Sequence, residues 1–568
     1  MRLHSAALSL RARLPRRLPR EPWNVLLLLV LLQWGALIAF VETVRHHGWL
    51  FYQGGDETFF YTSSWVVSHG HIPVSEIGFA WPYLTAPLDW IFGSNVLAAL
   101  PAIILLQVLI LLPLSTLAIY GVGARLGGRV IGYVAAVCWV LGPYASIPLW
   151  DHRYHAKYVE QFLPQALGLT GLGDFPSTVC LLVAALFFLR ALDGRGSGDM
   201  LLAGVATGFA IGIKPANALF LAGAALALVG SRRWRESATF AAALAPALLA
   251  LTLWKLKGLG YLPIVTKQQS AYAAGSSQQL PSLPLGLVFS KYSHFSWPRL
   301  EGNYLQLREF FWSVRLVQWI PLAGALAIAR RSWPKTLFLA GWLGAFVLVK
   351  GSSPAARIED GSFLRLFMPG LPPFVLLMAA IPLLWPRTGV RLADRFPWRR
   401  PALGWRARSV VAAAVIFAAV PLAVSAALPP LHRHTVATYY GENVFVPVDR
   451  FGLSASAAPN GAVSLVWPAQ PGSARAFYRV FRMQTVQLAP RQAVPPPAYD
   501  GIRCVPKKGA QHCTFEMDPL ASMRGTEYVD RPPKGRWSYR VAMVANWVND
   551  LERGDILQVS TPVRVRVQ

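Results

Sequence analysis

Two adjacent carboxylates, Asp56 and Glu57, follow a Gly-Gly pair in the segment 52–61. Like charges this close raise the pKa of one carboxyl group, which suits a general base that accepts a proton from a hydroxyl group. The same oxygens can also bind a divalent metal ion. Because two acids in a loop are commonly solvated surface groups, the pair indicates chemistry only together with its surroundings.

A second polar segment, 150–160, is rich in possible ligands. His152 and His155 are three positions apart, so they could share one face of a helix and bind a divalent ion together with Asp151, Glu160 or Asp56. The alternative is a hydrogen-bonded loop that contacts lipid headgroups. A divalent metal ion is the one cofactor that the sequence suggests, and no motif requires it.

These residues lie in a chain of 568 residues that is 54% hydrophobic and 14% charged, whereas soluble proteins are about 25% charged. A lipid bilayer is therefore the expected surroundings. The 54 Lys and Arg against 27 Asp and Glu give +27, and this excess lies in segments between apolar runs. That placement is typical of cytoplasmic loops of membrane proteins and argues against a nucleic-acid partner. Four cysteines exclude a disulfide-built scaffold.

Eleven apolar runs predict membrane-spanning helices. The runs are 23–41, 94–120, 130–149, 175–191, 201–213, 216–230, 237–254, 312–329, 336–350, 366–385 and 409–428. The arginine-rich connections predict a basic cytoplasmic N-terminus, 1–22, and the long outer loops 43–93, 150–174, 255–311 and 351–364. The two short runs around Lys214-Pro215 predict half-helices that protein or a wet cavity shelters.

From about residue 430 the composition changes to short β-rich stretches without a further apolar run. We expect an all-β sandwich over 430–568, outside the membrane, with strands at 462–467, 477–483, 536–544 and 559–567. The order and spacing of the motifs at Trp467, Tyr478 and Trp537 resemble a fibronectin type III domain over 455–568, in which the Trp belongs to the core. Cys504 and Cys513 could close the long insertion 484–525 with a disulfide, and two free thiols are the alternative.

The order of motifs over 22–390 resembles the GT-C superfamily of multi-spanning glycosyltransferases, and within it the protein O-mannosyltransferase and aminoarabinose transferase branch. The likeness lies in the Gly-Asp-Glu loop at 55–57, Gly173-Asp174-Phe-Pro176 at the fourth helix, the Gly-rich half-helix 208–213 ending at Lys214-Pro215, and the late segment 363–372 with Arg365. In that last segment Leu366 replaces the Tyr that the branch commonly has.

This resemblance implies an α-helical GT-C-like catalytic unit, 23–429, that transfers a sugar from a polyprenyl-phosphate donor, usually with inversion. The acceptor would be a glycan, a lipid or a protein on the outer face of the cytoplasmic membrane. It implies Asp56 as the general base, Glu57 orienting it or sharing a metal, and Asp174 as a further catalytic acid. Lys214 and Arg365 would neutralise the leaving phosphate, since cations in a bilayer are costly and mark function. The alternative for both is snorkelling to the interface.

The remaining candidates are contacts to substrate. Tyr61 and His71 share the outer loop of Asp56, and Arg357 is a further candidate for the donor phosphate. Asp151, His152 and His155 are substrate candidates as well as metal ligands. His294 and Trp297 lie in the third outer loop, and their aromatic faces could stack on a sugar ring. A solvated turn at Arg357 and an interfacial aromatic belt at Trp297 are the alternatives.

Two other functions fit a multi-spanning chain, namely a transporter or lipid flippase and a non-catalytic anchor for the sandwich. Transporters often contain two repeated halves with matching broken helices, and no such repeat is evident here. The acids also lie in outer loops, which favours the enzyme. The chain contains no Asn-x-Ser/Thr site, which favours a bacterial cell envelope over a eukaryotic secretory compartment.

Overall fold

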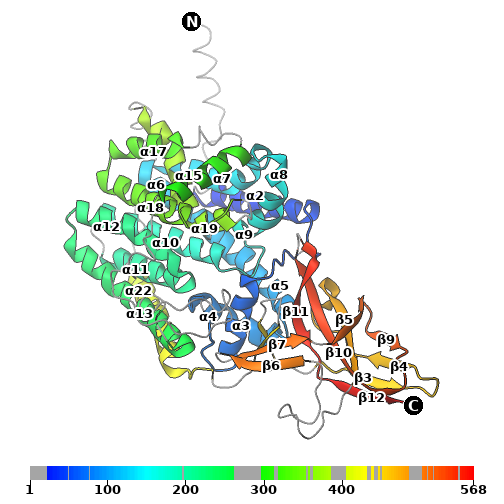
Figure 1. Ribbon diagram of the computed structural model, residues 1–568. Coiled ribbons are helices and arrows are strands. Elements are labelled where there is room, and N and C mark those ends of the chain that lie inside the picture. Colours follow the sequence, from blue (N-terminus) through cyan, green and yellow to red (C-terminus); the bar gives the residue numbers. More distant parts are fainter. Residues whose placement is uncertain are drawn as a thin grey trace.

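The computed structural model describes most of the chain after residue 21. The described ranges are 22–48, 50–75, 77–194, 197–260, 262, 296–311, 318–353, 356–358, 362–385, 405–431, 436–439, 445–447, 451–484, 502–507, 510–515, 517–547 and 550–568. Helices come first along the chain and strands follow, so the two kinds of structure form separate parts of the molecule (Figure 1).

Each of the eleven predicted apolar runs contains a helix, because backbone polar groups in a bilayer must be satisfied within the segment. These helices are α2 (Trp23–Thr43), α5 (Val96–Leu106) with η1 (Gln107–Leu111) and α6 (Leu112–Gly127), α7 (Arg129–Ala145), α10 (Asp174–Gly194), α11 (Ser197–Ile213), η4 (Pro215–Leu219) with α12 (Phe220–Gly230), α13 (Trp234–Leu259), α17 (Trp319–Ala329), α18 (Trp333–Gly351), α19 (Ser362–Phe367) with η5 (Met368–Gly370), α20 (Leu371–Ala380) and η6 (Ile381–Leu384), and α22 (Trp405–Ala427).

Within the described residues, six helices are long and apolar enough to cross a membrane. They are Trp23–Thr43, Val96–Gly127, Asp174–Gly194, Trp234–Leu259, Ser362–Leu384 and Ser409–Ala427. The helical part is therefore that of a multi-pass membrane protein, as the composition predicts. Four further apolar helices are shorter, so the number of crossings stays a prediction.

The predicted outer loops contain shorter helices. These are α3 (Asp56–Ser68), α4 (Ala80–Phe92), α8 (His152–Ala156), η3 (Lys157–Phe162), α9 (Leu163–Ala166) and α15 (Trp297–Phe310), and η2 (Ile147–Leu149) closes the apolar run before the second loop. Asp56 was expected in a loop, and it is instead the first residue of a helix.

The helix break predicted at Lys214-Pro215 is confirmed. Lys214 has extended backbone angles, φ −137° and ψ 106°, between α11 and η4. The buried amide of Asn217 donates to the Ala210 carbonyl at 2.9 Å. A side chain of the protein thus satisfies a carbonyl near the break, as non-helical backbone inside a membrane protein requires.

The strands form three sheets. The first contains β3 (Ser454–Ala457), β4 (Val463–Val466) and β9 (Glu527–Asp530); the second contains β5 (Phe477–Gln484), β8 (Asp518–Met523), β10 (Gly535–Trp547), β11 (Asp550–Val559) and β12 (Val563–Val567); the third contains β1 (Val436–Tyr439), β2 (Phe445–Pro447), β6 (Ile502–Lys507) and β7 (Ala510–Phe515). The first two are antiparallel throughout, and the third includes one parallel pair, β1 with β7.

The first two sheets share one core, which makes them a sandwich. Leu465 lies on β4 and Trp467 directly follows it, whereas Tyr478 and Val480 lie on β5. All four are buried in the same cluster. The four predicted strands are found, except that 559–567 is split into the end of β11 and β12. The fold class predicted from the sequence, a multi-pass helical protein with a C-terminal all-β sandwich, is confirmed.

The predicted insertion forms most of the third sheet. Its strands β6 and β7 are antiparallel, and Cys504 is the direct backbone partner of Cys513. Direct partners on antiparallel strands have the closest Cβ atoms between the two strands, which is the placement that a disulfide needs. The register therefore supports the disulfide, which stays a prediction.

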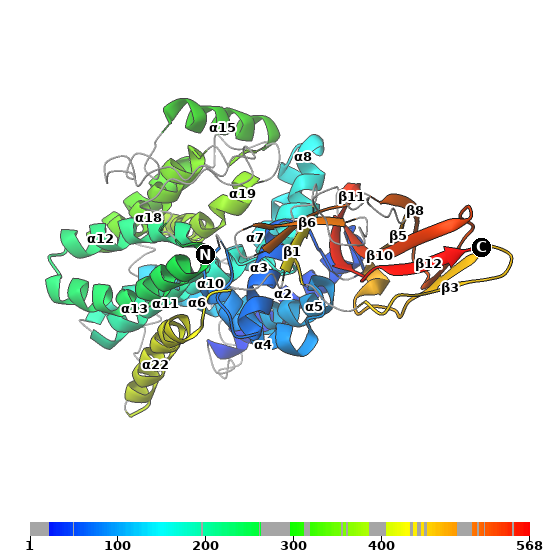
Figure 2. The same ribbon diagram turned by 60° about the horizontal axis from the view of Figure 1, so that its bottom comes forward.

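The sandwich packs against α5, and β2 of the third sheet packs against α3, so these two helices lie beside the strands (Figures 1 and 2). The buried amide of Asn95, at the start of α5, donates to the Pro471 carbonyl at 2.7 Å. At Gly472 a Cβ would lie 2.9 Å from Leu97. The sandwich is thus packed closely against the helical part.

Candidate active site

The turn before α3 positions Asp56. Gly54 and Gly55 have φ of 71° and 58°, values that favour glycine because a side chain is strained there. The turn places Asp56 and Glu57 in the first turn of α3, where the helix dipole stabilises negative charge. The Gly-Gly pair that precedes the two acids is therefore a structural requirement of their position.

Asp174 begins α10 at the same end of the helical part. The preceding residue is Gly173, where a Cβ would lie 2.9 Å from both Ile213 and Phe60. This close approach brings the start of α10 against α3 and the end of α11. Ile213 directly precedes Lys214, so the packing at Gly173 brings Asp174 to Lys214.

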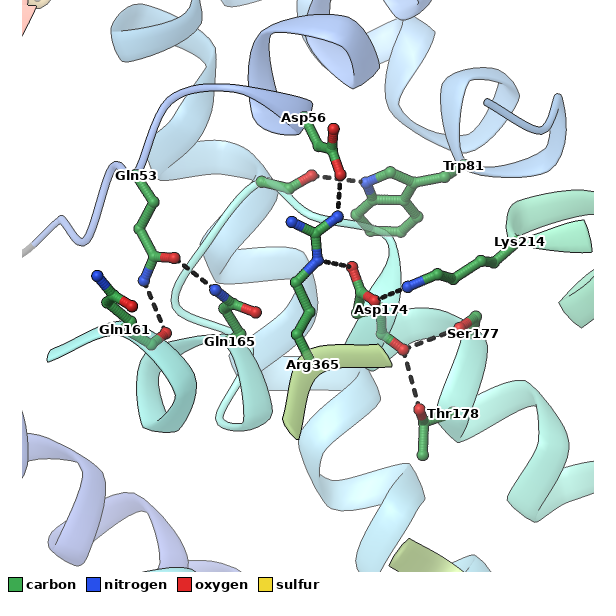
Figure 3. Close-up of polar contacts among 11 residues, drawn as sticks. Gln53, Asp56, Trp81, Gln161, Gln165, Asp174, Ser177, Thr178, Lys214 and Arg365 are labelled. Atoms are coloured by element: carbon green, nitrogen blue, oxygen red, sulfur yellow. Dashed lines mark hydrogen bonds and ion pairs between the residues drawn. The ribbon is translucent and has the colours of Figure 1, made fainter. Parts of the chain in front are cut away.

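Four charged side chains from four elements form one chain of ion pairs, the charge cluster (Figure 3). The Arg365 guanidinium of α19 donates through Nη2 to Asp56 and lies with Nε 3.4 Å from Asp174 Oδ2. Lys214 donates through Nζ to the other oxygen of Asp174. Asp56, Asp174, Lys214 and Arg365, separated by up to 309 positions, are thus brought together.

The two carboxylates of the charge cluster differ in exposure. The side chain of Asp56 is 42% exposed, whereas that of Asp174 is 2% exposed. A buried carboxylate is held by its partners, and an exposed one can exchange them for a substrate. Asp56 is therefore placed to react, and Asp174 is placed to orient Lys214 and Arg365.

Glu57 points into the protein and ties two loops together. Its carboxylate accepts the backbone N–H of Gln53 at 2.6 Å and that of Gly171 at 2.5 Å. Burial raises the pKa of Glu57 from 4.5 to about 7, with a smaller upward contribution from the charge of Asp555. Its described contacts give it a role in holding the Asp56 turn.

Lys350, at the end of α18, is a cation that the sequence did not single out. It interacts electrostatically with Lys214 and Asp174. With Lys350 included, three cations and the two carboxylates of the charge cluster have a net charge of +1 when all five groups are ionised. Such a group favours binding of an anion.

Gln53, which is half-buried, and the buried Gln165 also hold the predicted outer loops, and their residue type gave no signal in the sequence. Gln53 donates to the Gln161 carbonyl at 2.7 Å and accepts from Gln165 at 2.5 Å. Trp81 donates to the Gly171 carbonyl at 3.0 Å. Only the folded chain shows that these residues support Asp56 and Asp174.

The predicted metal set Asp56, His152 and His155 is not assembled. Among the described residues, no three His, Cys, Asp or Glu side chains are grouped to hold a metal ion. Asp151 instead binds Arg153 at 3.0 Å, and the place between Asp56 and Asp174 is taken by an arginine. A cation of the chain itself thus lies beside Asp56, and a metal at Asp56, His152 and His155 stays a prediction.

The other predicted substrate residues that the structure describes are not part of the charge cluster. The buried Tyr61 hydroxyl donates to the Gly93 carbonyl at 3.0 Å, and the His71 ring contacts the His69 carbonyl at 2.9 Å. Arg357 and Trp297 are exposed. His294 lies outside the described residues. Contacts of these side chains with a substrate stay predictions.

One segment of the chain matches a known family. Residues 161–254 match the family model of dolichyl-phosphate-mannose-protein mannosyltransferase. The matched segment is well under half of the chain, and it contains Asp174 and Lys214. No curated protein matches the chain.

Three solved structures are similar to the chain over most of its length. The apo oligosaccharyltransferase of Archaeoglobus fulgidus shares 15% identity over 72% of this chain and 57% of its own, with a TM-score of 0.38. ArnT from Cupriavidus metallidurans, bound to undecaprenyl phosphate, shares 15% over 71% and 70%, with a TM-score of 0.38.

Archaeal AglB from Archaeoglobus fulgidus, with an inhibitory peptide and a dolichol-phosphate, shares 14% over 73% of this chain and 57% of its own, with a TM-score of 0.36. The chain thus spans 57% of the length of the archaeal protein. The role of each residue at the site therefore follows from the contacts that it makes in this chain.

Proposed function

We propose that this chain is a glycosyltransferase that moves a sugar from a polyprenyl-phosphate donor to a hydroxyl group outside the cytoplasmic membrane. The observation that carries the proposal is the charge cluster, in which an exposed carboxylate, Asp56, is linked through Arg365 to a buried one, Asp174. The family match supports it, because the matched segment includes Asp174 and Lys214 and the family's name describes transfer from a lipid phosphate sugar.

The donor phosphate binds among the cations of the charge cluster. Without a donor, Arg365 is shared between Asp56 and Asp174. An incoming phosphate takes the place of Asp56 beside Arg365, and Lys214 and Lys350 add positive charge next to it. Binding of the donor thereby frees the Asp56 carboxylate to act as a base. The site couples donor binding to activation of the acceptor.

The reaction is a direct displacement at the anomeric carbon. The acceptor oxygen bonds to that carbon from the face opposite the phosphate, and its proton passes to Asp56. The bond between the carbon and the phosphate oxygen breaks, and its electron pair leaves with polyprenyl phosphate. Attack from the opposite face inverts the anomeric centre. Arg365 and Lys214 stabilise the charge that develops on the phosphate.

The sandwich is proposed to lie outside the membrane, beside the acceptor. Its two facing sheets, with Trp467 in the shared core, support the resemblance to a fibronectin type III domain. The proposed division is a cytoplasmic N-terminus, 1–22, a catalytic unit, 23–429, and the sandwich unit, 430–568. A cell-envelope glycan, a lipid or a protein can each supply the acceptor hydroxyl, and a hexose or a pentose the transferred sugar.

The experiment must separate a transferase from a flippase, which is the alternative for a multi-spanning chain. The purified protein in liposomes is given undecaprenyl-phosphate mannose, and in parallel a pentose donor, each labelled in the sugar, with a cell-envelope extract as acceptor. We expect labelled glycoside and free undecaprenyl phosphate in equal amounts. Labelled lipid that crosses the bilayer without any glycoside would identify a flippase and overturn the proposal.

A further inference from the structure

We propose that Asp555, on β11 of the sandwich, is a positioning residue for Asp56. It holds the turn that carries Asp56 through the hydroxyl of Tyr52, so that the sandwich completes the active site. The Tyr52 hydroxyl donates to Asp555 Oδ2 at 2.7 Å across 503 positions of sequence. The inference rests on the transfer function proposed above.

The turn that carries Asp56 cannot hold itself in place. Between Tyr52 and Asp56 the chain contains Gly54 and Gly55, both at positive φ. Glycine has the largest conformational freedom of any residue, so the position of Asp56 depends on contacts to either side of the glycine pair.

Most of those contacts come from the helical part. After the pair, Glu57 accepts the N–H of Gly171. Before it, Gln53 is held by Gln161 and Gln165. Glu57 also accepts the N–H of Gln53 and closes the turn. Tyr52 is the next residue upstream, and its described hydroxyl contact comes from the sandwich.

The Tyr52 contact is buried and charged, which makes it directional. Tyr52 is 0% exposed and Asp555 is 2% exposed. Burying a carboxylate is costly unless hydrogen bonds compensate it. A hydrogen bond to an ionised acceptor is roughly twice as strong as one between neutral groups. The pair therefore fixes the ring of Tyr52 in one place more firmly than apolar packing would.

The sandwich is attached to the helical part firmly enough for Asp555 to restrain Tyr52. Beside Asp555 on β11, Gln558 accepts from Asn95 at 3.2 Å, and Asn95 also binds the Pro471 carbonyl. Gln558 and Asn95 are buried. The segment around Asp555 is thus joined to the helical part at a second point, the start of α5.

Kinetics and amide hydrogen exchange of the full-length protein test the inference together. The variants are Tyr52→Phe, Asp555→Ala and the double variant, with undecaprenyl-phosphate mannose as donor. Tyr83→Phe is the matched control, because its hydroxyl makes an equally short contact, 2.8 Å to Ser425, that joins α4 to α22. Asp555→Asn tests rescue, since its amide oxygen can still accept from Tyr52.

We expect Tyr52→Phe and Asp555→Ala to lower kcat about tenfold, the loss that follows removal of a hydrogen bond to a charged group. The KM for the donor should stay within about twofold, because the cations of the charge cluster are untouched. The double variant should lose no more than either single one, and Asp555→Asn should recover most of the rate. Exchange should speed up in peptides covering 53–57, and Tyr83→Phe should change neither measurement.

An active wild type with unchanged kcat in Tyr52→Phe and Asp555→Ala would overturn the inference. So would losses that multiply in the double variant, or a rise in KM alone. If the wild type binds undecaprenyl phosphate and transfers no sugar, the proposed function fails. In that case amide exchange of residues 53–57 still tests the role of Asp555 separately. Unchanged exchange in Tyr52→Phe would show that the contact between Tyr52 and Asp555 does not hold the turn.

Discussion

Arg365 contacts two carboxylates, and their different exposure decides which contact a substrate can break. The pair with Asp56 is partly open to solvent, where ion pairs contribute only about 0 to 1 kcal/mol. The pair with Asp174 is buried, where removal of one partner leaves an uncompensated charge. In the proposed function, a donor phosphate therefore displaces Asp56 and leaves the pairing of Asp174 intact.

Lys214→Gln should weaken binding of undecaprenyl phosphate about tenfold or more, because a charged hydrogen-bond donor is lost. The protein should still fold, since Asp174 keeps Arg365 as a partner. Asp174→Asn should lower the unfolding temperature more than Lys214→Gln does, because it leaves Lys214 and Arg365 without their buried carboxylate. Equilibrium binding and thermal unfolding measure the two effects. Arg299→Gln, at an exposed position of α15, is the control, and normal lipid binding by Lys214→Gln would contradict the phosphate role.

The raised pKa of Glu57 predicts that the stability of the folded protein depends on pH. Its pKa in the folded protein, about 7, is above its ordinary value of 4.5, so the folded state holds the proton more tightly. The stabilisation is fully present below about pH 4.5 and is lost as the pH rises through 7, on the order of 3 kcal/mol. Unfolding temperatures between pH 5 and pH 8 should fall less steeply in Glu57→Gln. Equal slopes in both proteins would refute the prediction.

At the scale of elements, the apolar pattern predicted the helices well. Each of the eleven runs is helical, and the break at Lys214 is where a cation followed by proline indicated it. Local pattern decides these features. The start of α3 at Asp56 was missed, because the following residues are mostly buried on several faces and show no clean amphipathic period.

The residues that support the site could not be predicted from the sequence. Gln53, Lys350 and Asp555 belong to types that are common in any chain, and each contacts partners far away along it. Only the folded chain, including strand β11 of the sandwich, brings these groups to the site. Asp174, Lys214 and Arg365 were found because a family motif or the cost of a charge in a bilayer marks them.

Gly173→Ala should damage the site through the packing of elements. The added Cβ would lie 2.9 Å from Ile213 and Phe60, and overpacking of this kind costs about 1 to 3 kcal/mol. The shift should separate Asp174 from Lys214 and lower transfer about tenfold. Gly142→Ala in α7 is the control, since nothing lies within 4 Å of its Cβ. A Gly173→Ala protein with the wild-type rate would show that this contact does not set the ion pair.

At the scale of the whole molecule, the packing of the sandwich on α3 and α5 was not predictable, because it depends on single contacts at Tyr52 and Asn95. From the sequence, the sandwich is predicted as a separate unit and its role is left open. Its contact with the segment next to Asp56 requires the sandwich and the base to lie on the same side of the membrane.

The sidedness can be measured by cysteine labelling. In a variant without native cysteines, Asp518→Cys on β8 should react with a membrane-impermeant maleimide in intact cells. Arg235→Cys, at an arginine-rich connection, should react only after permeabilisation, since positive loops stay in the cytoplasm. Both positions are exposed. The reverse pattern would place the base away from the proposed donor and acceptor.

The most direct test is the rate of sugar transfer by Asp56→Asn. The donor is undecaprenyl-phosphate mannose, or the pentose donor if the wild type uses that one. Glu42→Gln, at an exposed acid at the end of α2, is the control. A general base contributes about 10² to 10⁴ in rate, so Asp56→Asn should lose at least a hundredfold. It should bind undecaprenyl phosphate at least as tightly as the wild type, because Asp56 no longer competes for Arg365. Glu42→Gln should behave as the wild type. An Asp56→Asn protein that transfers the sugar at the wild-type rate would contradict the account.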